Sequence, residues 1–327
     1  MLFISGRRLS LLRLDEADRR RNPAFLLILP TEKVARRASH VKIEGLIARI
    51  ARIARIARTM KHTLLLIDGL NILRRVYEAN PAEDIPAKVE GAVLSALASF
   101  RRALTECKPT HALAAFDTGG KTWRHALYPQ YRQHRKPMDP ELAEVLPDFR
   151  LTLTEVLGLQ TAMIEGYEAD DIIATAFYRW TASKEGQVIP VSTDKDVLQL
   201  IADGAIVRNH FATAKNGEPS WFDERYVMDK FGVGSHQLAD YLALLGDSTD
   251  DIPGVEKVGA KTAAKLLQRY GDLEGVLANA AEEKGVVGKN LAEQAHLARL
   301  SRQLLSLKTD AQLGLTWNML RVGDTAE

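Results

Sequence analysis

Three apolar stretches of this chain each run directly into an aspartate, and this pattern restricts the fold more than any other feature of the sequence. Residues 63–69 read TLLLIDG, residues 111–117 read HALAAFD, and residues 188–193 (VIPVST) are followed at once by Asp194. Short apolar runs almost free of charge are typical of parallel strands that are buried on both faces. Residues 87–105 have helical apolar spacing and contain no proline. Strands that alternate with helices predict an α/β fold with a mainly parallel central sheet flanked by helices.

The ends of these strands also have a functional meaning. In open α/β sheets, ligands bind beyond the carboxyl ends of the strands. Asp68, Asp117 and Asp194 stand at three such ends, so we expect them to meet at one edge of the sheet. Pro190 has no N–H for the ladder, which argues against the third strand.

Composition excludes several other classes of protein. The 327 residues are 46% hydrophobic and 26% charged, as in ordinary globular domains. A single cysteine, Cys107, allows no internal disulfide and no zinc site built on several cysteines, and it fits a reducing compartment. No apolar run reaches the roughly 18 residues that a membrane span requires. Residues 24–30 (AFLLILP) are too few for the core of a signal peptide.

The net charge of +2 hides a strong asymmetry along the chain. Residues 1–60 carry a net charge of +9, and residues 61–327 carry −7. Proteins that coat nucleic acid usually show a basic excess, so an acidic body argues against that class. The acidic excess instead fits many carboxylates packed into one metal site.

The first sixty residues differ from the rest in pattern. Residues 47–58 repeat the triplet IAR, and a period of three drifts around a helix of 3.6 residues per turn. One interpretation is a basic arm for nucleic acid or an arginine-rich transit peptide. The other, which we favour, is an extension outside the fold, with a self-contained protein starting at Met60. We therefore expect residues 1–60 to be a basic extension, disordered or separate from the core.

Four groups of acidic residues are candidates for metal chemistry. Neighbouring acids repel one another unless cations neutralise them, and hard divalent ions prefer carboxylate oxygens. Two such ions, about 4 Å apart, can bind the attacking and leaving oxygens of a phosphodiester. The groups are Asp68 (LIDGLN) with Asp117 (AAFD); Glu168, Asp170 and Asp171 (EADD); Asp194 and Asp196 (STDKD); and Asp247 and Asp250 (GDSTDD).

Each group taken alone has an ordinary structural explanation. EADD fits a helix N-terminus, where the helix dipole favours acids. STDKD fits a capped turn after a strand, and GDSTDD fits a solvated turn. Their joint occurrence in this order therefore carries the argument for a metal site.

Two further segments have a composition suited to DNA. Residues 123–147 are rich in arginine, lysine, histidine and aromatics, which would neutralise phosphates and stack on unpaired bases. Residues 254–262 (GVEKVGAKT) suggest a hairpin whose glycines allow close approach to a phosphate. A solvated basic loop and a plain helix–turn–helix linker are the respective alternatives.

The last third of the chain is expected to be helical. Asp223 and Ser235 are candidate N-caps, and residues 261–270 and 289–307 have helical spacing.

In order, the motifs LIDGLN, AAFD, YEADD, STDKD and GDSTDDIPGVEKVGAKTA resemble those of the 5′ nuclease superfamily. This superfamily includes the nuclease domain of bacterial DNA polymerase I, phage 5′ exonucleases and flap endonucleases. The chain is most similar to its stand-alone exonuclease-IX-like group, over residues 61 to about 307. The resemblance implies a PIN-like core at 61–224 with an arch region at 118–150. It also implies a helix-hairpin-helix subdomain at 225–327.

The resemblance also implies a role for each motif residue. One metal position is assigned to Asp68, Asp117, Glu168, Asp170 and Asp171, and a second to Asp194, Asp196, Asp247 and Asp250. Arg132 stands where the family has a catalytic lysine that contacts the scissile phosphate. The other DNA-contacting positions are Tyr131, Arg135, Lys257, Val258, Gly259, Ala260, Lys261 and Thr262. A K⁺ ion would be held by the backbone carbonyls of Leu244, Leu245, Pro253, Val255 and Val258.

The implied activity is hydrolysis of DNA by a metal-dependent 5′–3′ exonuclease and flap endonuclease. The implied cofactors are two Mg²⁺ ions, with Mn²⁺ as a substitute, and K⁺. The implied partner is DNA with 5′ flaps, nicks or free 5′ ends, in bacterial replication and repair in the cytoplasm, with no membrane and no obligate protein partner. Two alternatives remain: a non-catalytic protein that binds branched DNA, and an RNA-processing nuclease.

Overall fold

A computed structural model describes residues 62–183, 186–213 and 219–323. The expectations for residues 1–60 lie outside this part of the chain. Within it, no helix is long and apolar enough to cross a membrane.

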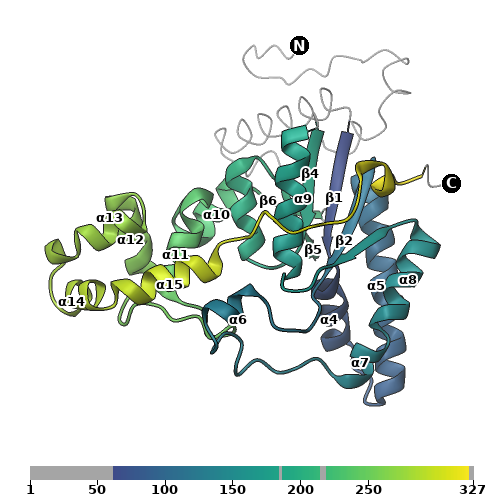
Figure 1. The fold of residues 1–327 in the computed structure, drawn as a ribbon, viewed down its shortest axis with the longest axis horizontal. Helices are drawn as coiled ribbons and strands as arrows, with labels where there is room; N and C mark the ends of the chain where they lie inside the picture. Colours follow the sequence, from purple (N-terminus) through teal and green to yellow (C-terminus); the bar gives the residue numbers. More distant parts are fainter. Residues whose placement is uncertain (1–61, 184–185, 214–218, 324–327) are drawn as a thin grey trace, which may run out of the picture. The chain divides into compact units, whose positions relative to one another are not determined.

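A mainly parallel sheet forms the centre of the fold (Figure 1). Its order is β3-β2-β1-β4-β5-β6; all neighbours pair in parallel except the antiparallel β5–β6 hairpin. The predicted α/β class is therefore confirmed. The strands are β1 (His62–Asp68), β2 (His111–Phe116), β3 (Gln160–Met163), β4 (Gly186–Val191), β5 (Val207–Thr213) and β6 (Pro219–Phe222).

The sheet is covered on both faces, which explains its uninterrupted apolar strands. Leu64 and Leu66 of β1 pack in one cluster with helix α9 (Ala169–Ser183), and Leu65 and Ile67 pack in a second cluster on the opposite face. Alternate side chains of a strand point to opposite faces, so all four residues are buried. The second face is covered by α4 (Gly69–Ala79), α5 (Ile85–Cys107) and α8 (Leu146–Leu157).

Pro190 does lie inside a strand, contrary to the argument against it. It pairs with Leu66 of β1, while β4 pairs with β5 only at Val191. Because β4 forms few ladder hydrogen bonds with β5, the missing N–H of Pro190 is tolerated there.

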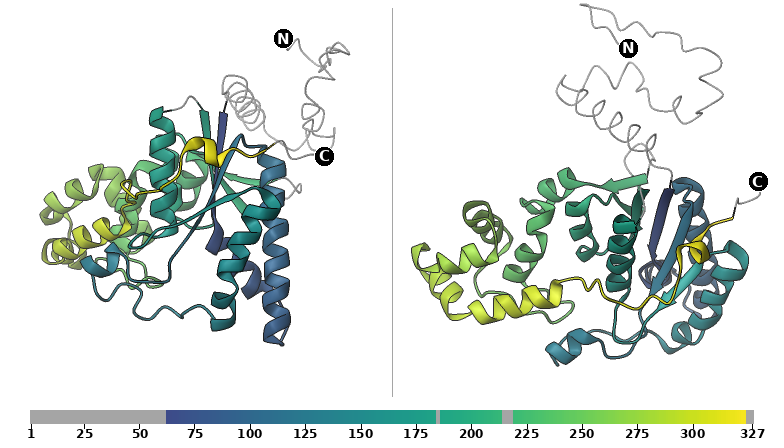
Figure 2. Two further views of the ribbon diagram at one scale, coloured as in Figure 1. Left: turned by 45° about the vertical axis from the view of Figure 1, so that its right-hand side comes forward. Right: turned by 45° about the horizontal axis from the view of Figure 1, so that its top comes forward.

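The region between β2 and β3 is partly helical. It contains α6 (Trp123–Leu127) and α7 (Pro140–Glu144), joined by a loop, before α8 begins. In Figures 1 and 2 this segment runs past the carboxyl ends of β1 and β2. The segment that we expected to form an arch therefore lies at the edge of the sheet where the strand-end aspartates stand.

The C-terminal part is helical, as predicted, with two corrections to its boundaries. Asp223 caps α10 through a bond from the N–H of Tyr226 (3.0 Å), but Ser235 is not an N-cap. Ser235 instead opens a 3₁₀ turn, and its hydroxyl donates to Glu224. The helices are α10 (Glu224–Phe231), α11 (Leu238–Leu245), α12 (Ala260–Tyr270), α13 (Leu273–Ala278), α14 (Val286–Glu293) and α15 (Ala295–Leu305); the 3₁₀ turns are η2 (Asp196–Asp203), η3 (Ser235–Gln237), η4 (Ala280–Glu282) and η5 (Trp317–Leu320).

The single helix expected at residues 289–307 is in fact two. The chain leaves helical geometry at Gln294, between α14 and α15. The side-chain oxygen of Gln294 accepts the N–H of Glu256 at 2.8 Å, so the break positions a residue that supports the hairpin after α11.

After α15 the chain returns across α9 to the sheet (Figure 1). Thr175 on α9 donates to the carbonyl of Lys308 (3.4 Å) and accepts the N–H of Ala311 (3.3 Å). The ring of Trp317 packs edge-on against Trp180 at 5.1 Å between centroids. These contacts join the helical part to the core at one surface of α9.

Candidate active site

The first carboxylates lie where the central strands end. Asp68 is the last residue of β1 and also caps α4, since it accepts the N–H of Asn71 at 3.1 Å. Ser192, just after β4, donates its hydroxyl to the second oxygen of Asp68 at 2.9 Å. Asp117, just after β2, accepts the N–H of Ala169 at 2.6 Å. Short bonds thus tie the ends of β1 and β4 to each other, and the end of β2 to the start of α9.

A second group stands at the N-terminus of α9. Glu168 immediately precedes the helix, and Asp170 lies in its first turn. Glu168 is buried and accepts the hydroxyls of Thr122 (3.0 Å) and Tyr131 (3.1 Å). The helix dipole favours acids here, but only the tertiary fold brings the two hydroxyls from the arch region to Glu168.

The other carboxylates come from two loops. Asp194 lies just after β4, and Asp196 begins η2; the N–H of Asp196 donates to Asp194 at 2.9 Å. Asp247 and Asp250 lie on the loop after α11, which a short antiparallel bridge closes at its base. The ammonium of Lys195 contacts Asp247 at 2.7 Å. The two loops therefore meet through one ion pair.

These acids form one electrostatic cluster. Burial, together with the charges of Asp117 and Asp194, raises the pKa of Asp68 to about 8. Burial also raises the pKa of Asp196, with further contributions from Asp194 and Asp170. The structure therefore brings carboxylates from the strand ends, α9 and η2 close enough to repel one another.

Arginine side chains already neutralise part of the cluster. Arg132 pairs with Glu168 at 2.9 Å and with Asp250 at 3.1 Å, and Arg124 pairs with Asp170 at 3.1 Å. Among the described residues, no three acidic, histidine or cysteine side chains are arranged around one point as metal ligands. In this arrangement Glu168, Asp170 and Asp250 form ion pairs with arginines.

Other members of the cluster have no such partner. One buried oxygen of Asp196 accepts no hydrogen bond from the described residues. A buried acceptor without a partner is unfavourable, and an all-oxygen site of high negative charge suits a hard divalent cation. The charge of Asp194 acts on both Asp196 and Asp68, so these three carboxylates fit a divalent-metal site.

Asp171 is held by the largest number of hydrogen bonds among the described acids of the cluster. It is fully buried, and its two oxygens accept bonds from the ring N–H of Trp123 (2.9 Å), from Arg124 (3.0 Å) and from the N–H of Lys308 (2.8 Å). Burial and the charge of Asp170 raise its pKa, so it belongs to the same repelling group. In this arrangement Asp171 joins the arch region and the C-terminal segment to α9, and its role as a metal ligand stays a prediction.

The arch residues expected at DNA contact the carboxylates. Tyr131 is buried, and its ring packs edge-on against His125 at 5.2 Å between centroids, so it offers no face to an unpaired base. In this arrangement the ring is therefore not placed for base stacking, and the DNA contact expected for Tyr131 stays a prediction. Arg135 pairs with Asp250 at 3.4 Å, so two arginines of the arch region contact the same loop.

The hairpin after this loop packs its backbone closely against the end of α11, while the approach to a phosphate expected of its glycines stays a prediction. A Cβ placed on Gly254 would lie 2.4 Å from the carbonyl oxygen of Leu245, so only glycine fits there. No side chain caps the start of α12 at Gly259. The first N–H groups of that helix are therefore available to an external acceptor such as a phosphate. Lys257 and Lys261 are exposed beside them, whereas the side chain of Val258 is buried.

The carbonyls expected around K⁺ lie at the end of α11 and at the start of the hairpin. The carbonyl of Leu244 accepts the N–H of Val255 (2.9 Å), that of Val255 accepts the N–H of Val258 (3.0 Å), and that of Pro253 accepts the hydroxyl of Ser301. A carbonyl oxygen has two lone pairs, so these bonds leave each oxygen a second acceptor site.

Two family models match consecutive parts of the chain. The N-terminal resolvase-like domain of 5′-3′ exonucleases matches residues 63–232, and their C-terminal SAM fold matches residues 233–327. The chain belongs to the 5′-3′ exonuclease family.

Curated relatives of this 5′-3′ exonuclease cover most of its length. Flap endonuclease Xni of Psychromonas ingrahamii is 33% identical over 270 residues, which are 82% of this chain and 100% of the relative. Flap endonuclease Xni of Vibrio parahaemolyticus is 35% identical over 260 residues, or 79% and 95% of the two chains. Family membership identifies the chain as a nuclease.

Solved structures share the fold of this 5′-3′ exonuclease. T5 5′-exonuclease with bound zinc has a TM-score of 0.59 at 20% identity, over 76% of this chain and 90% of that one. A mutant of T5 5′-exonuclease has a TM-score of 0.58 at 20% identity, over 75% and 88% of the two chains. The sheet and the helical subdomain are thus arranged as in that phage enzyme.

One residue that contacts several acids of the site of this 5′-3′ exonuclease was not predicted from the sequence. Arg124 is buried, donates from Nε to the carbonyl of Leu304 (2.8 Å), and contacts Asp170 (3.1 Å), Asp171 (3.0 Å) and Glu168 (3.4 Å). It is one of several basic residues in a segment that looked like a solvated loop. Only the contacts made by the fold distinguish Arg124 from its neighbours.

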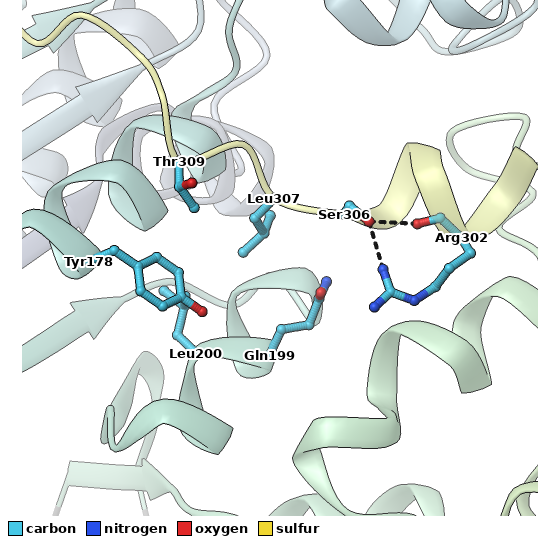
Figure 3. Close-up of a pocket in the computed structure, with 7 residues that line it drawn as sticks. All are labelled: Tyr178, Gln199, Leu200, Arg302, Ser306, Leu307 and Thr309. Atoms are coloured by element: carbon cyan, nitrogen blue, oxygen red, sulfur yellow. Dashed lines mark hydrogen bonds between the residues drawn. The ribbon is translucent and has the colours of Figure 1, made fainter. Parts of the chain in front are cut away.

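A cavity of about 490 Å³ lies apart from the carboxylates, between α9, η2 and the segment after α15 (Figure 3). Its lining residues are Tyr178, Gln199, Leu200, Arg302, Ser306, Leu307 and Thr309. Arg302 is its basic residue and already pairs with Asp240 while donating to Ser306 at 2.6 Å. We therefore assign this cavity no role in the nuclease reaction.

The raised pKa of Asp68 predicts how the stability of this 5′-3′ exonuclease depends on pH without divalent ions. In the folded protein the pKa is about 8, against 3.8 for the ordinary group, so the folded state binds the extra proton between these values. Stability is therefore expected to fall as pH rises from 5 to 8, by up to about 1.4 kcal/mol per pH unit for one proton. Urea unfolding in EDTA across this range measures the slope.

Asp68→Asn removes one titrating group and is expected to reduce this slope, while other acids with a raised pKa, such as Glu168, keep part of it. An unfolding free energy that does not change between pH 5 and 8 in the original protein would contradict the assignment. The direction is opposite to that of a salt-bridged acid, whose stabilisation is lost on acidification.

Proposed function

We propose that this nuclease is a divalent-metal-dependent 5′–3′ exonuclease and flap endonuclease that hydrolyses DNA near 5′ ends or junctions. The observation that carries the proposal is a cluster of buried, mutually repelling carboxylates at the carboxyl edge of the sheet. Basic residues of the arch region lie directly against it. Relatives that match over 95% or more of their own length are named flap endonucleases, and this supports the choice of substrate.

Two Mg²⁺ ions are the proposed cofactors, with Mn²⁺ as a substitute. Ions bound there would activate the attacking water and stabilise the leaving oxygen of the phosphodiester. In this arrangement the oxygens of Glu168, Asp170 and Asp171 accept bonds within the protein, which ions would replace. The proposed ligands are Asp68, Asp117, Glu168, Asp170 and Asp171 for one ion, and Asp194, Asp196, Asp247 and Asp250 for the other.

The residues of the chain would hold DNA at two places. Arg132 and Arg135 would contact phosphates near the bond that is cut, because both already lie at the carboxylates. The N–H groups of Gly259, Ala260 and Lys261 at the start of α12, with Lys257 and Thr262 beside them, would contact the duplex. A K⁺ ion held by the carbonyls of Leu244, Leu245, Pro253, Val255 and Val258 would stiffen that hairpin.

The loop of residues 247–252 links these two contacts. It carries Asp250, which binds the arch region, and it leads directly into the hairpin. DNA held by the hairpin would therefore be positioned relative to the carboxylates. A bacterial cytoplasmic location is proposed together with this activity.

Cleavage of a 5′-labelled DNA flap tests the proposal. We expect products in Mg²⁺ or Mn²⁺ that end in a 5′-phosphate and a 3′-hydroxyl, and none in EDTA, because the carboxylates alone cannot activate water. Gel electrophoresis of the labelled products measures cleavage. Equal cleavage with and without EDTA would contradict a metal-dependent mechanism.

The same assay separates the two alternatives. A protein that only binds branched DNA would retain the flap in a binding assay but release no product in either metal. An RNA-processing nuclease would cut a matched RNA flap faster than the DNA flap. Faster cleavage of the DNA flap is expected, since family relatives of full length are named flap endonucleases.

A further inference from the structure

Arg132 bridges carboxylates that belong to the two proposed metal positions. Its Nη2 lies 2.9 Å from Glu168 and donates to Asp250 at 3.2 Å, and its Nε lies 3.1 Å from the other oxygen of Asp250. The side chain of Arg132 is 20% exposed, against 3% for Glu168 and 15% for Asp250. A single guanidinium thus neutralises two acids at the point where proposed ligands of both ions meet.

The backbone holds Arg132 in this position. Its φ of 55° is in the left-handed region, which is uncommon for a residue with a side chain, and its N–H donates to the carbonyl of Asp250 at 3.0 Å. Two residues later, the N–H and the ring of His134 both contact Asp251 at 2.9 Å. The base of the arch region is therefore docked on the loop of residues 247–252.

The second arginine of the site has a different environment. Arg124 is 3% exposed and is fixed by the carbonyl of Leu304 as well as by acids. The ion pairs of the Arg132 guanidinium with described residues are to Glu168 and Asp250, and it lies over the ring of Tyr131 at 5.0 Å from the ring centroid. Arg124 is a permanent counter-ion, whereas Arg132 can leave the carboxylates without breaking other polar bonds of its side chain.

The choice of arginine matters for this bridge. A guanidinium presents several donors in a fixed fork and reaches two carboxylates at once, whereas an ammonium is a single point of charge. A lysine at this position could neutralise one of the two acids but would not span both in the same way.

We propose that Arg132 is an exchangeable internal cation that joins Glu168 and Asp250 in the metal-free protein and yields them to divalent ions. The inference rests on the proposed function, because it takes these acids as metal ligands. In the metal-free state, ions must compete with Arg132, which lowers their apparent affinity. The displaced guanidinium is then free to contact a phosphate of DNA.

Calcium titration of the full chain by calorimetry, without DNA, tests this competition. Arg132→Gln is expected to bind Ca²⁺ about tenfold more tightly than the original protein, because the competing cation is gone. Arg132→Lys is expected to fall between the two, since the ammonium keeps the charge but loses the bridge. An unchanged or weaker Ca²⁺ affinity in both variants would overturn the proposal.

Arg135→Gln is the matched control. It removes the same charge from the same loop contact, but Arg135 reaches only Asp250, at 3.4 Å, and is 33% exposed. Its effect on Ca²⁺ affinity is expected to be less than about threefold, from the general change in charge. Equal effects of Arg132→Gln and Arg135→Gln would show that charge alone acts, and would overturn the bridging role.

The outcome is separable from that of the proposed function. Flap cleavage by the original protein in Mg²⁺ tests the nuclease activity without reference to Arg132. If cleavage occurs but Arg132→Gln leaves the Ca²⁺ affinity unchanged, only the exchangeable cation is refuted. If the variant binds Ca²⁺ more tightly but no cleavage occurs, the exchange is supported and the proposed substrate is wrong.

Discussion

Replacing Asp170 with asparagine is expected to lower flap cleavage by at least about 100-fold while the protein still binds the flap. Loss of groups that only support a metal ligand already costs about 10–100-fold, so loss of a ligand charge should cost at least as much. Asparagine has the same shape as aspartate and keeps an oxygen that can accept the N–H of Asp171. In the original protein this N–H donates to the Asp170 carboxylate at 2.7 Å. Cleavage rates in Mg²⁺ and flap binding in Ca²⁺ measure the two effects.

Asp229→Asn is the control for this substitution. Asp229 is exposed on α10 and pairs with Arg225, one turn away. Its replacement is expected to leave cleavage unchanged, because it lies outside the carboxylate cluster. Full activity in Asp170→Asn, with the control also active, would refute the assignment of Asp170 as a ligand.

Replacing Arg124 with methionine is expected to lower the free energy of unfolding by about 3–5 kcal/mol in EDTA. Removal of one partner from a buried ion pair leaves the other charges uncompensated, and Arg124 contacts Glu168, Asp170 and Asp171. Methionine keeps much of the apolar volume, so the loss reports mainly on charge and hydrogen bonds. Urea unfolding of both proteins measures the difference.

Added Mg²⁺ should restore part of this loss, because the ions proposed to bind here would neutralise the same carboxylates. Arg299→Met provides the comparison. Arg299 binds Glu274 through two bonds but is half exposed, so its loss is expected to change the free energy of unfolding only slightly. An equal loss in Arg124→Met and Arg299→Met would show that the buried cluster does not depend on Arg124.

Arg124 and Arg132 together set how much of the negative charge of the site is neutralised without metal ions. Arg124 neutralises acids at the start of α9 from inside the fold, and Arg132 neutralises Glu168 and Asp250 from the arch region. Asp196 retains a buried oxygen without a partner among the described residues. The metal-free protein is thus partly neutralised, and the remaining charge is what ions would balance.

The sequence determined the elements whose pattern is local. Apolar runs ending in Asp68 and Asp117 predicted buried parallel strands, since a strand covered on both faces tolerates few charges. The cap at Asp223 and the helix from residue 261 also followed from neighbouring residues alone. The order of the acidic motifs indicated the family because several weak signals agreed.

The sequence did not determine which of these acids have free oxygens. Asp170 and Asp171 are adjacent in the chain, yet the side chain of Asp170 is 16% exposed, whereas that of Asp171 is fully buried among three donors. Their difference depends on Trp123, Arg124 and Lys308, which arrive from distant parts of the chain. The break between α14 and α15 likewise depends on a contact of Gln294 with the hairpin.

The roles of the arginines were also decided by the tertiary structure. In the sequence, Arg124, Arg132 and Arg135 are similar basic residues of one segment. The fold buries the first, places the second between two carboxylates and leaves the third at the rim. The strands ending at Asp68 and Asp117 and the cap at Asp223 depend on neighbouring residues, so the sequence alone predicted them. Charge pairing depends on distance and burial, which only the folded chain sets.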